Sequence, residues 1–469
     1  MLRNKNIHYL ERDIIELSLE DRLLASAQRI LDKETIEDAG DKALRNHQIP
    51  AFNKFADYIM NLATTPDSYD SSQYCRIVLP PRTGKTVIAG KIIALAGLCT
   101  TFVVPTKTLV NQTYEALRSQ LPQIPIGLYY GGKKCPVNNG VNITTYATLQ
   151  KHYNHGILPK CICKSALVFL DEAHHSMTDM RVNTIDNAFE DKAIRIALTA
   201  TPDYNEHRRL QHFFPELIHG LELHDAFELG LLAAARMWVI EVDTDASTVN
   251  LIAGDYEQKL LGRLMSGSPF FKAVQDFRYF ESNIEIPALI TCSSRHQAYD
   301  LWLYLKKQKP KNRPNPGLIL GETSNRDRER LLSNFECGLV DTLIQVGVLI
   351  EGWNAPQCKL LLDLAPSLSR VRATQKYFRV MTRHENKEAR IVVILPKHLP
   401  RLPILPIDLL LKPGDNYYCG DLLRPSEKYA ANERVPIDKI SKSPIKSVKV
   451  KTRVIASASL IKPSLNPDE

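Results

Sequence analysis

The chain has 469 residues, of which 44% are hydrophobic and 24% are charged, the composition of a folded protein of roughly two to four domains that each bury a core. This length and composition exclude a disulfide-stapled miniprotein and a wholly disordered chain. A multispan membrane protein is also excluded, because the longest apolar stretch, residues 92–104, contains Gly and Thr residues and ends at Pro105. Lys and Arg outnumber Asp and Glu by 60 to 52, and residues 439–469 hold seven basic and two acidic residues, so a polyanionic partner is permitted without being required.

The cysteines and the N-terminus favour a cytoplasmic protein. Nine cysteines, an odd number scattered mostly through apolar segments, indicate free thiols of a reducing compartment. Cys161 and Cys163, with Cys135 upstream, are too few and too closely spaced for a zinc site. Residues 1–20 carry charges where a signal peptide needs its apolar stretch. We expect no membrane partner.

The first half of the chain is predicted to form an α/β domain after a helical extension. Residues 1–40 have helical spacing and are predicted to form a helical N-terminal extension. In residues 41–236, short apolar runs alternate with helix-like stretches, which predicts a doubly wound, mostly parallel sheet. The expected strands are residues 75–80, 100–105, 141–145, 165–171 and 195–200.

A second α/β domain is predicted over residues 286–398. Its expected strands are residues 287–294, 317–322, 341–348, 359–365 and 389–396, with helices over 295–306, 324–336 and 369–384. Residues 237–285 are interpreted as a linker with a helical insertion, since a Ser-Gly-Ser-Pro cluster interrupts their helical pattern. Residues 399–469 are interpreted as a proline-rich arm and a basic tail.

The sequence Arg82-Thr83-Gly84-Lys85-Thr86 lies between an expected strand and an apolar helix. Such a turn aims backbone N–H groups at phosphate oxygens, while Lys85 would meet the β- and γ-phosphates of ATP and the Thr86 hydroxyl would hold Mg²⁺. Leu79 stands where the pattern G-x-x-x-x-G-K-[ST] begins with glycine, so only half of the motif is present. The alternative is a chance tripeptide before a helix.

Two carboxylates follow a later buried strand, in Asp171-Glu172-Ala173-His174. Parallel-sheet proteins bind ligands at this end of their strands. Asp171 would bind Mg²⁺, Glu172 would orient and deprotonate the attacking water, and His174 could sense the γ-phosphate. Taken alone, these acids could equally cap the next helix.

With these motifs the sequence resembles the superfamily 2 helicases, DEAH/DEAD-box in the wide sense, and the group shared with restriction-enzyme motor subunits, over residues 43–396. The resemblance implies two tandem RecA-like domains. It also implies that Gln48, in Leu44-Arg45-Asn46-His47-Gln48, recognises adenine, and it places Arg45 and Gly352, with the loop of residues 82–86, at the nucleotide.

The resemblance further assigns residues to nucleic-acid binding and to its coupling with hydrolysis. Pro105, Thr106, Lys107 and Thr145 match strand-binding motifs of the first domain, and Ser294 and Arg295 match one of the second. Thr199 and Thr201 lie in the motif Ala197-Leu198-Thr199-Ala200-Thr201-Pro202, which couples hydrolysis to movement in that family.

Gln375, Arg379 and Arg383 resemble the family's arginine-finger motif Q-x-x-G-R-x-x-R. Phe378 replaces its glycine, and the second arginine follows the first by four residues rather than three. We expect both arginines on one helix face, and which of them reaches the γ-phosphate stays open.

The resemblance implies a nucleic-acid-stimulated ATPase motor, a helicase or translocase, that hydrolyses ATP with Mg²⁺ and prefers DNA to RNA. A hydrolysis-impaired clamp that closes on nucleic acid is the alternative, because Leu79, Arg82 and Phe378 depart from the family pattern. A metabolic P-loop kinase is disfavoured because it predicts a single α/β domain. We expect a monomer in solution, with a separate nuclease as a possible partner.

Overall fold

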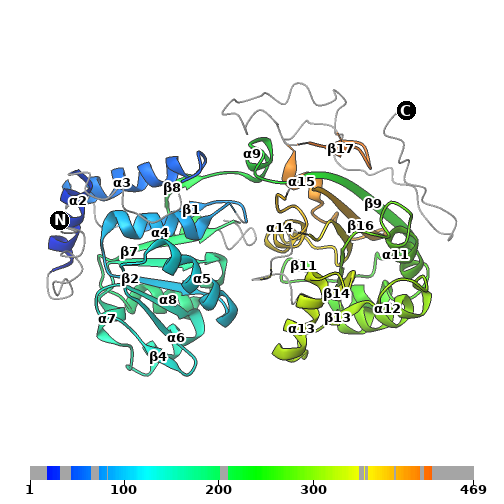
Figure 1. The fold of residues 1–469 in the computed structure, drawn as a ribbon, viewed down its shortest axis with the longest axis horizontal. Coiled ribbons are helices and arrows are strands. Elements are labelled where there is room, and N and C mark those ends of the chain that lie inside the picture. Colours follow the sequence, from blue (N-terminus) through cyan, green and yellow to red (C-terminus); the bar gives the residue numbers. More distant parts are fainter. Residues whose placement is uncertain are drawn as a thin grey trace. The chain divides into compact units, whose positions relative to one another are not determined.

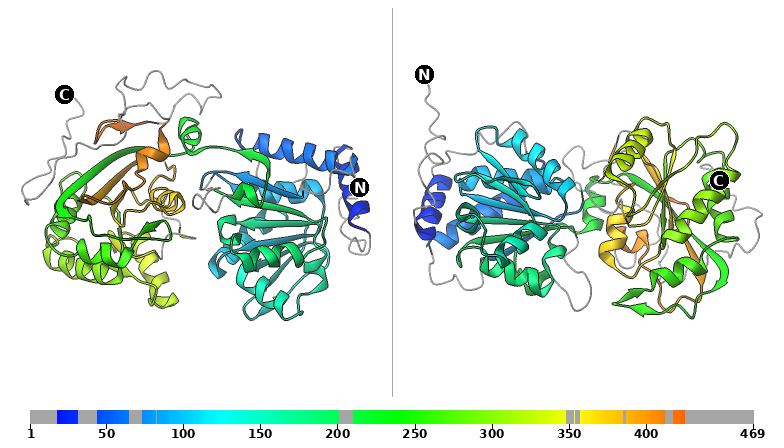
Figure 2. Two further views of the ribbon diagram at one scale, coloured as in Figure 1. Left: turned by 180° about the vertical axis from the view of Figure 1, so that it is seen from behind. Right: turned by 90° about the horizontal axis from the view of Figure 1, so that it is seen from below.

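The computed structural model describes residues 18–31, 44–64, 73–81, 83–200, 210–347, 353, 357–384, 387–411 and 417–424. The chain divides into two compact units, with Glu222 as the last residue of the first and Leu223 as the first residue of the second. Each unit is built around one large sheet covered by helices (Figures 1 and 2). The second unit therefore begins before residue 236, where the sequence placed the end of the first domain.

The first unit contains an eight-stranded sheet in the order β4-β3-β5-β2-β6-β7-β1-β8. All neighbours pair in parallel except β4, which is antiparallel to β3. The central strands are buried on both faces, as their continuous apolar runs predict. The strands are β1 (Tyr74–Val78), β2 (Thr100–Val104), β3 (Ile126–Tyr130), β4 (Lys133–Cys135), β5 (Val141–Thr145), β6 (Leu167–Asp171), β7 (Ile194–Thr199) and β8 (Glu216–Gly220).

Helices connect these strands and cover both faces of the sheet (Figure 1). They are α3 (Ile49–Thr64), α4 (Lys85–Ala96), α5 (Lys107–Gln120), α6 (Tyr146–Asn154), α7 (Lys160–Cys163) and α8 (Asp179–Asn187), with 3-10 turns η3 (Ala173–Ser176) and η4 (Leu210–His212). Helix α2 (Leu19–Leu31) packs against α3 and α4. Its fully buried Arg22 donates to the Lys164 carbonyl at 2.7 Å and pairs with Glu190, so α2 is part of the core of this unit.

The second unit contains a seven-stranded sheet in the order β13-β14-β12-β15-β16-β9-β17. Its neighbours are parallel except β17, which is antiparallel to β9. The two mostly parallel sheets with flanking helices confirm the predicted fold class. The strands are β9 (Ala234–Asp245), β12 (Ala288–Cys292), β13 (Gly317–Ile319), β14 (Thr342–Gln345), β15 (Leu360–Leu364), β16 (Glu388–Lys397) and β17 (Leu422–Leu423).

The segment interpreted as a linker, residues 237–285, belongs to the core of the second unit. Strand β9 pairs with β16 from Ala234–Glu388 to Val242–Pro396, and its polar residues occupy the less buried positions of an alternating pattern. Helices α10 (Gln258–Leu264) and α11 (Phe270–Arg278) contribute buried apolar side chains to the same core. Trp238, Ile240 and Val242 of β9 are buried in this core together with the side chains of α10 and α11.

The remaining elements of the second unit are α9 (Leu223–Glu228), the hairpin β10 (Leu251–Ile252) and β11 (Asp255–Tyr256), α12 (Arg295–Gln308), α13 (Asn325–Glu336), α14 (Arg370–Tyr377) and α15 (Pro406–Leu410). Within the proline-rich arm, α15 places buried leucines in the core. The basic tail of residues 439–469 lies outside the described residues. Among the helices that are described, none is both long and apolar enough to cross a membrane, and the nine cysteines are free.

Candidate functional site

Residues 79–81, 83 and 84 lie between β1 and α4 and precede the start of the helix at Lys85. Gly84 adopts a left-handed conformation with φ 93°, and a Cβ atom at this position would lie 2.2 Å from the amide nitrogen of Gln48. Glycine is therefore required both for the backbone angle and for the close approach. Helix α4 begins at Lys85, so its first N–H groups are available to an anion.

Leu79 does not obstruct this loop although it replaces the first glycine of the motif. Its side chain is fully buried in the core of the first unit. Its backbone N–H donates to the Thr199 carbonyl at 2.8 Å, at the end of β7. Inside the loop, the Thr83 hydroxyl donates to the Pro80 carbonyl at 2.8 Å. The departure from the pattern is accommodated by the core.

The segment containing Gln48 is attached to the loop by side chains. The Gln48 amide donates to the Thr83 carbonyl at 2.9 Å, and its oxygen accepts from the Arg45 N–H at 2.8 Å. Nε2 of His47 lies 2.8 Å from the same Thr83 carbonyl. Burial lowers the pKa of His47, which favours a neutral ring that donates from Nε2. No role was predicted for His47, although it lies between Arg45 and Gln48.

The carboxylates lie at the end of β6. Glu172 has a left-handed backbone with φ 45°, a strained conformation that is concentrated at functional sites in non-glycine residues. One of its carboxylate oxygens is 3.9 Å from Nζ of Lys85 and the other is 3.6 Å from Nδ1 of His174. Asp171 is buried beside it. The structure thus brings together four predicted residues from two segments.

Tyr146 supports this group and was missed by sequence reasoning. Its hydroxyl donates to the Asp171 carbonyl at 3.0 Å, and burial, followed by the charge of Asp171, raises its pKa. The ring is fully buried, so the hydroxyl stays protonated and holds the end of β6 in place.

The donor set fits ATP with Mg²⁺. The Thr86 hydroxyl and the Asp171 carboxylate are hard oxygen ligands, and Mg²⁺ is usually bound by one or two such groups together with substrate phosphates and water. Within the described residues, no cluster of three or more His, Cys, Asp or Glu side chains forms a complete metal cage. The Lys85 ammonium donates to the Leu79 carbonyl at 3.4 Å and places a positive charge at the start of α4.

The predicted nucleic-acid residues of both units lie at the starts of helices. The Thr106, Thr145 and Ser294 hydroxyls accept from N–H groups in the first turns of α5, α6 and α12 at 3.2 to 3.3 Å. Each helix follows the carboxyl end of a strand, and exposed Lys107 and Arg295 come directly after two of the caps. Pro105 follows β2, and Thr199 is buried at the end of β7.

The arginine-finger residues differ from the expectation. Helix α14 ends at Tyr377, so Arg379 and Arg383 do not share a helix face. Arg379 donates to the Trp353 carbonyl, and Arg383 donates to the Gly230 carbonyl at 2.8 Å. Gln375 is half-buried on α14. Arg82, Thr201 and Gly352 lie outside the described residues.

A buried ion pair anchors α14, and sequence reasoning missed it. Lys376 pairs with Asp363 on β15, and both side chains are buried. Asp363 also accepts from the Thr291 hydroxyl at 2.6 Å and from the Tyr377 hydroxyl at 3.3 Å. These contacts join residues far apart in the sequence, and no local pattern predicts them.

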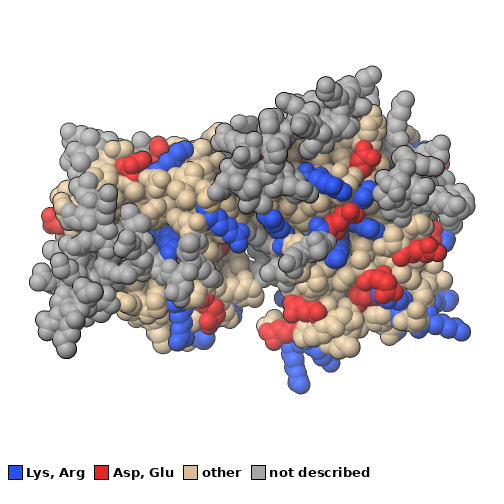
Figure 3. Space-filling model, turned by 45° about the horizontal axis from the view of Figure 1, so that its top comes forward, with Lys and Arg blue, Asp and Glu red and all other residues tan. Residues whose placement is uncertain are grey.

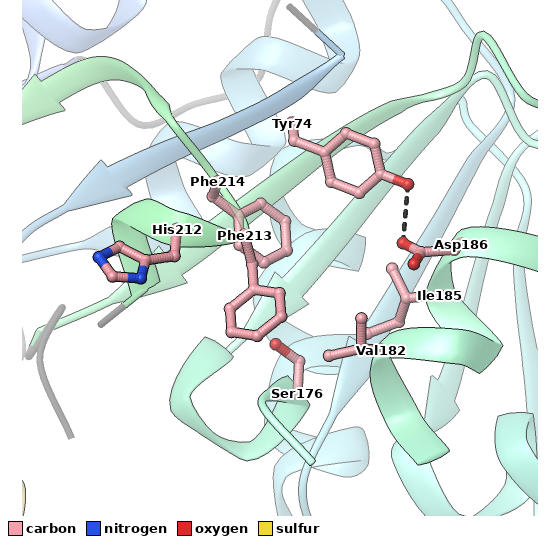
Figure 4. A pocket seen from close by; sticks show the side chains of 8 residues that line it. All are labelled: Tyr74, Ser176, Val182, Ile185, Asp186, His212, Phe213 and Phe214. Carbon is pink, nitrogen blue, oxygen red and sulfur yellow. Dashed lines mark hydrogen bonds between the residues drawn. The ribbon is translucent and has the colours of Figure 1, made fainter. Parts of the chain in front are cut away.

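A hollow of about 310 Å³ lies in the first unit (Figure 4), and none of the residues that line it belongs to the segment 79–86. One of its walls is closed by the Tyr74 hydroxyl, which donates to the Asp186 carboxylate at 2.8 Å. Burial raises the pKa of Tyr74 to about 12. Its lining contains none of the predicted site residues and consists of Tyr74, Ser176, Val182, Ile185, Asp186, His212, Phe213 and Phe214. We do not assign ATP to it.

Comparison with known proteins finds similarity over part of the chain. Residues 41–204 match the family described as type III restriction enzyme, res subunit. The chain is 21% identical over 291 residues to IRC3 of Saccharomyces cerevisiae, named as an ATP-dependent helicase, covering 60% of this chain and 41% of that protein. It is 26% identical over 327 residues to Rad25 of Haloarcula marismortui, named as a DNA 3'-5' helicase, covering 67% and 48%. These matches support the resemblance of the chain to superfamily 2 helicases and restriction-enzyme motors.

Solved structures agree with the fold. The type ISP restriction-modification enzyme LlaBIII bound to DNA has a TM-score of 0.55 at 14% identity, covering 76% of this chain and 28% of that one. Dbp5 of S. cerevisiae bound to RNA has a TM-score of 0.52 at 14% identity, covering 82% and 90%. The two sheets are thus those of tandem RecA-like domains. The chain spans less than half the length of the two curated relatives.

Proposed function

We propose that this superfamily 2 protein is an ATPase motor, a helicase or translocase, whose hydrolysis of ATP is stimulated by nucleic acid. The observation that carries the proposal is the approach of Lys85 and Glu172, whose charged groups are 3.9 Å apart. The pair sets a phosphate-binding cation against a carboxylate that can accept a proton from water. Relatives named as helicases support this assignment.

We assign each site residue a role that is consistent with its position. The N–H groups at the start of α4 and the Lys85 ammonium bind the phosphates, which draws Lys85 away from Glu172. Glu172 is then free to orient the attacking water and to accept its proton, while His174 keeps contact with the carboxylate. Thr86 and Asp171 hold Mg²⁺, which when bound neutralises charge on the phosphates. Gln48, with Arg45, reads the base, and one of Arg379 and Arg383 reaches the γ-phosphate during the cycle.

DNA is the favoured nucleic acid. The relative with 26% identity is named as a DNA helicase, and LlaBIII was solved with DNA, although Dbp5 was solved with RNA. A separate nuclease is a possible partner, and a cytoplasmic, monomeric state remains a sequence-based prediction. The clamp without hydrolysis is not favoured, because the Leu79 side chain is buried in the core and the charged groups of Lys85 and Glu172 lie 3.9 Å apart.

The proposal is tested by measuring phosphate release from ATP, alone and with single-stranded DNA, duplex DNA, single-stranded RNA or duplex RNA, each added separately. The wild-type chain is expected to release phosphate slowly alone and faster with polynucleotide, with DNA more effective than RNA. ATP binding without release under every condition would instead support the clamp.

A further inference from the structure

One side of the first unit, outside the ATP site, carries basic residues without acidic neighbours in the sequence. From Ala116 to Leu170 the chain contains no Asp or Glu. The same stretch contains Arg118, Lys133, Lys134, Lys151, Lys160 and Lys164. Strand β4 and helix α6, which carry three of these lysines, are joined by side-chain contacts at the end of the sheet formed by β4 (Figure 1).

Lys134 is held in a fixed position on β4. Its ammonium lies 4.2 Å from the centre of the Tyr129 ring and 3.3 Å from Nε2 of His152 on α6. Nδ1 of His152 is 2.5 Å from the Tyr129 hydroxyl. Burial, and then the charges of Lys134 and Lys151, lower the pKa of His152, so its neutral ring can accept from Lys134 through Nε2 and donate through Nδ1.

The cations of this cluster repel one another. Burial lowers the pKa of Lys134, and the charge of Lys151 lowers it further. No carboxylate of the described part of the chain forms an ion pair with Lys133, Lys134 or Lys151, whereas Lys164 is paired with Glu190 at 3.9 Å. A bound anion would relieve this repulsion.

The cluster continues to the edge of the sheet that carries the predicted nucleic-acid residues. Lys107 lies over the turn between β3 and β4, since a Cβ at Gly131 would be 3.8 Å from its Nζ. Lys133 follows that turn, with Nζ 5.8 Å from the centre of the Tyr130 ring. The Tyr130 hydroxyl donates to Asn111 of α5 at 2.9 Å. The turn thus joins Lys107 to the lysines of β4.

We propose that Lys107, Lys133, Lys134 and Lys151, which we call the β4 basic edge, form a further contact surface for the phosphate backbone of nucleic acid. The proposal rests on the proposed function, and it extends the contact from Lys107 along β4 to α6. Tyr129 and Tyr130 are only 5% and 8% exposed, so their rings are not available for base stacking. The contact is therefore electrostatic and independent of sequence.

The test is a triple variant, Lys133→Ala with Lys134→Ala and Lys151→Ala, in the full chain. The matched control is Lys306→Ala with Lys307→Ala and Lys311→Ala, three exposed lysines of the second unit that include one over Trp302 at 4.8 Å. On the face of the second unit visible in Figure 3, basic side chains are interspersed with acidic ones. A third variant with Arg at the three edge positions keeps the charge.

Fluorescence anisotropy with labelled DNA and RNA is measured over about 0.05 to 0.25 M salt. The edge variant is expected to bind about tenfold more weakly at low salt, with a slope of log K against log salt reduced by about two, since fewer phosphates are neutralised. The control and the Arg variant should bind as the wild type does. Binding of a fluorescent ATP analogue should be equal in all chains, which confirms folding.

The outcomes separate this inference from the proposed function. A wild-type salt slope in the edge variant, or equal losses in the edge variant and the control, would overturn the β4 basic edge and leave the ATPase motor standing. A wild-type chain that binds none of the polynucleotides would overturn both.

Discussion

The residues of the candidate site are constrained mainly through the backbone of the loops that carry them. Gly84 and Glu172 both adopt left-handed conformations, at the turn before α4 and at the end of β6. Glycine adopts this conformation at residue 84 without a steric penalty because it has no Cβ atom. Glu172 has a Cβ atom, so its left-handed backbone conformation is strained. The packing of β6 and η3 around it must offset this strain. The geometry holds its carboxylate toward Lys85.

His47 predicts a pH dependence of stability. Because burial lowers its pKa from the ordinary value of 6.5, the unfolded chain binds a proton more readily, and stability falls as the pH drops below about 6.5. Burial also lowers the pKa values of His152 and His219, which adds to the same loss. In His47→Gln, which keeps a donor for Thr83, the loss between about pH 7 and pH 5 should be smaller.

Hydrogen exchange of the buried β1 and β7 amides, corrected for intrinsic exchange rates, measures this effect in the first unit. An equal loss of stability in the variant and the wild type would contradict the role given to His47.

The two arginines of the second unit can be separated by single variants. If Arg379 or Arg383 reaches the γ-phosphate, its Ala variant should lose hydrolysis by about 10³-fold while ATP affinity changes far less. Arg372→Ala is the control, since Arg372 lies on α14 and pairs with Asp255 at 3.1 Å. Wild-type turnover in both Arg379→Ala and Arg383→Ala would show that the motif is misaligned.

At the level of elements, the sequence predicted strands with continuous apolar runs well. Residues 141–145 form β5 with the predicted bounds, and residues 167–171 of the run 165–171 form β6. Strand β9 was not among the predicted strands, although residues 237–240 form an apolar run followed by alternating polar and apolar residues. Helix α14 was predicted too long because Val380 and Met381 continue an apolar pattern. Val380 and Met381 are buried although they lie outside the helix. The side chains of Arg379 and Arg383 donate to backbone carbonyls and hold this segment in place.

In the candidate site, too, the sequence predicted only those residues that belong to local motifs. Lys85, Asp171, Glu172 and His174 could be named because each belongs to a local motif beside an apolar strand. His47 and Tyr146 could not, because their roles depend on contacts with loops 36 and 25 residues away. Such contacts are set by tertiary packing rather than by periodicity.

The ion pair of Lys376 and Asp363 makes a prediction about α14. Lys376→Met should lower the free energy of unfolding of the second unit by about 3 kcal/mol, because Asp363 is left buried without its cation. The double variant with Asp363→Leu should lose less than the sum of the two single variants. Tryptophan fluorescence during urea unfolding reports on this unit, since Trp238, Trp302 and Trp353 all lie in it. Additive losses would contradict the coupling.

At the level of the whole molecule, much of the net positive charge lies in the C-terminal tail. Residues 439–469 carry seven basic and two acidic residues and no aromatic residue, which suits phosphate contacts without stacking. Removing this tail should leave the maximal ATPase rate unchanged, raise the polynucleotide concentration needed for half-stimulation and flatten the salt dependence of binding. An identical salt slope before and after truncation would contradict this role.

In the proposed motor, ATP hydrolysis stimulated by nucleic acid depends on Lys85 and Glu172. The most direct measurement compares ATP binding and phosphate release in the wild type, Lys85→Ala and Glu172→Gln, with DNA present. We predict that Lys85→Ala abolishes turnover, because phosphate charge is left uncompensated, and that Glu172→Gln binds ATP but releases almost no phosphate. Turnover close to that of the wild type in either variant would contradict the account.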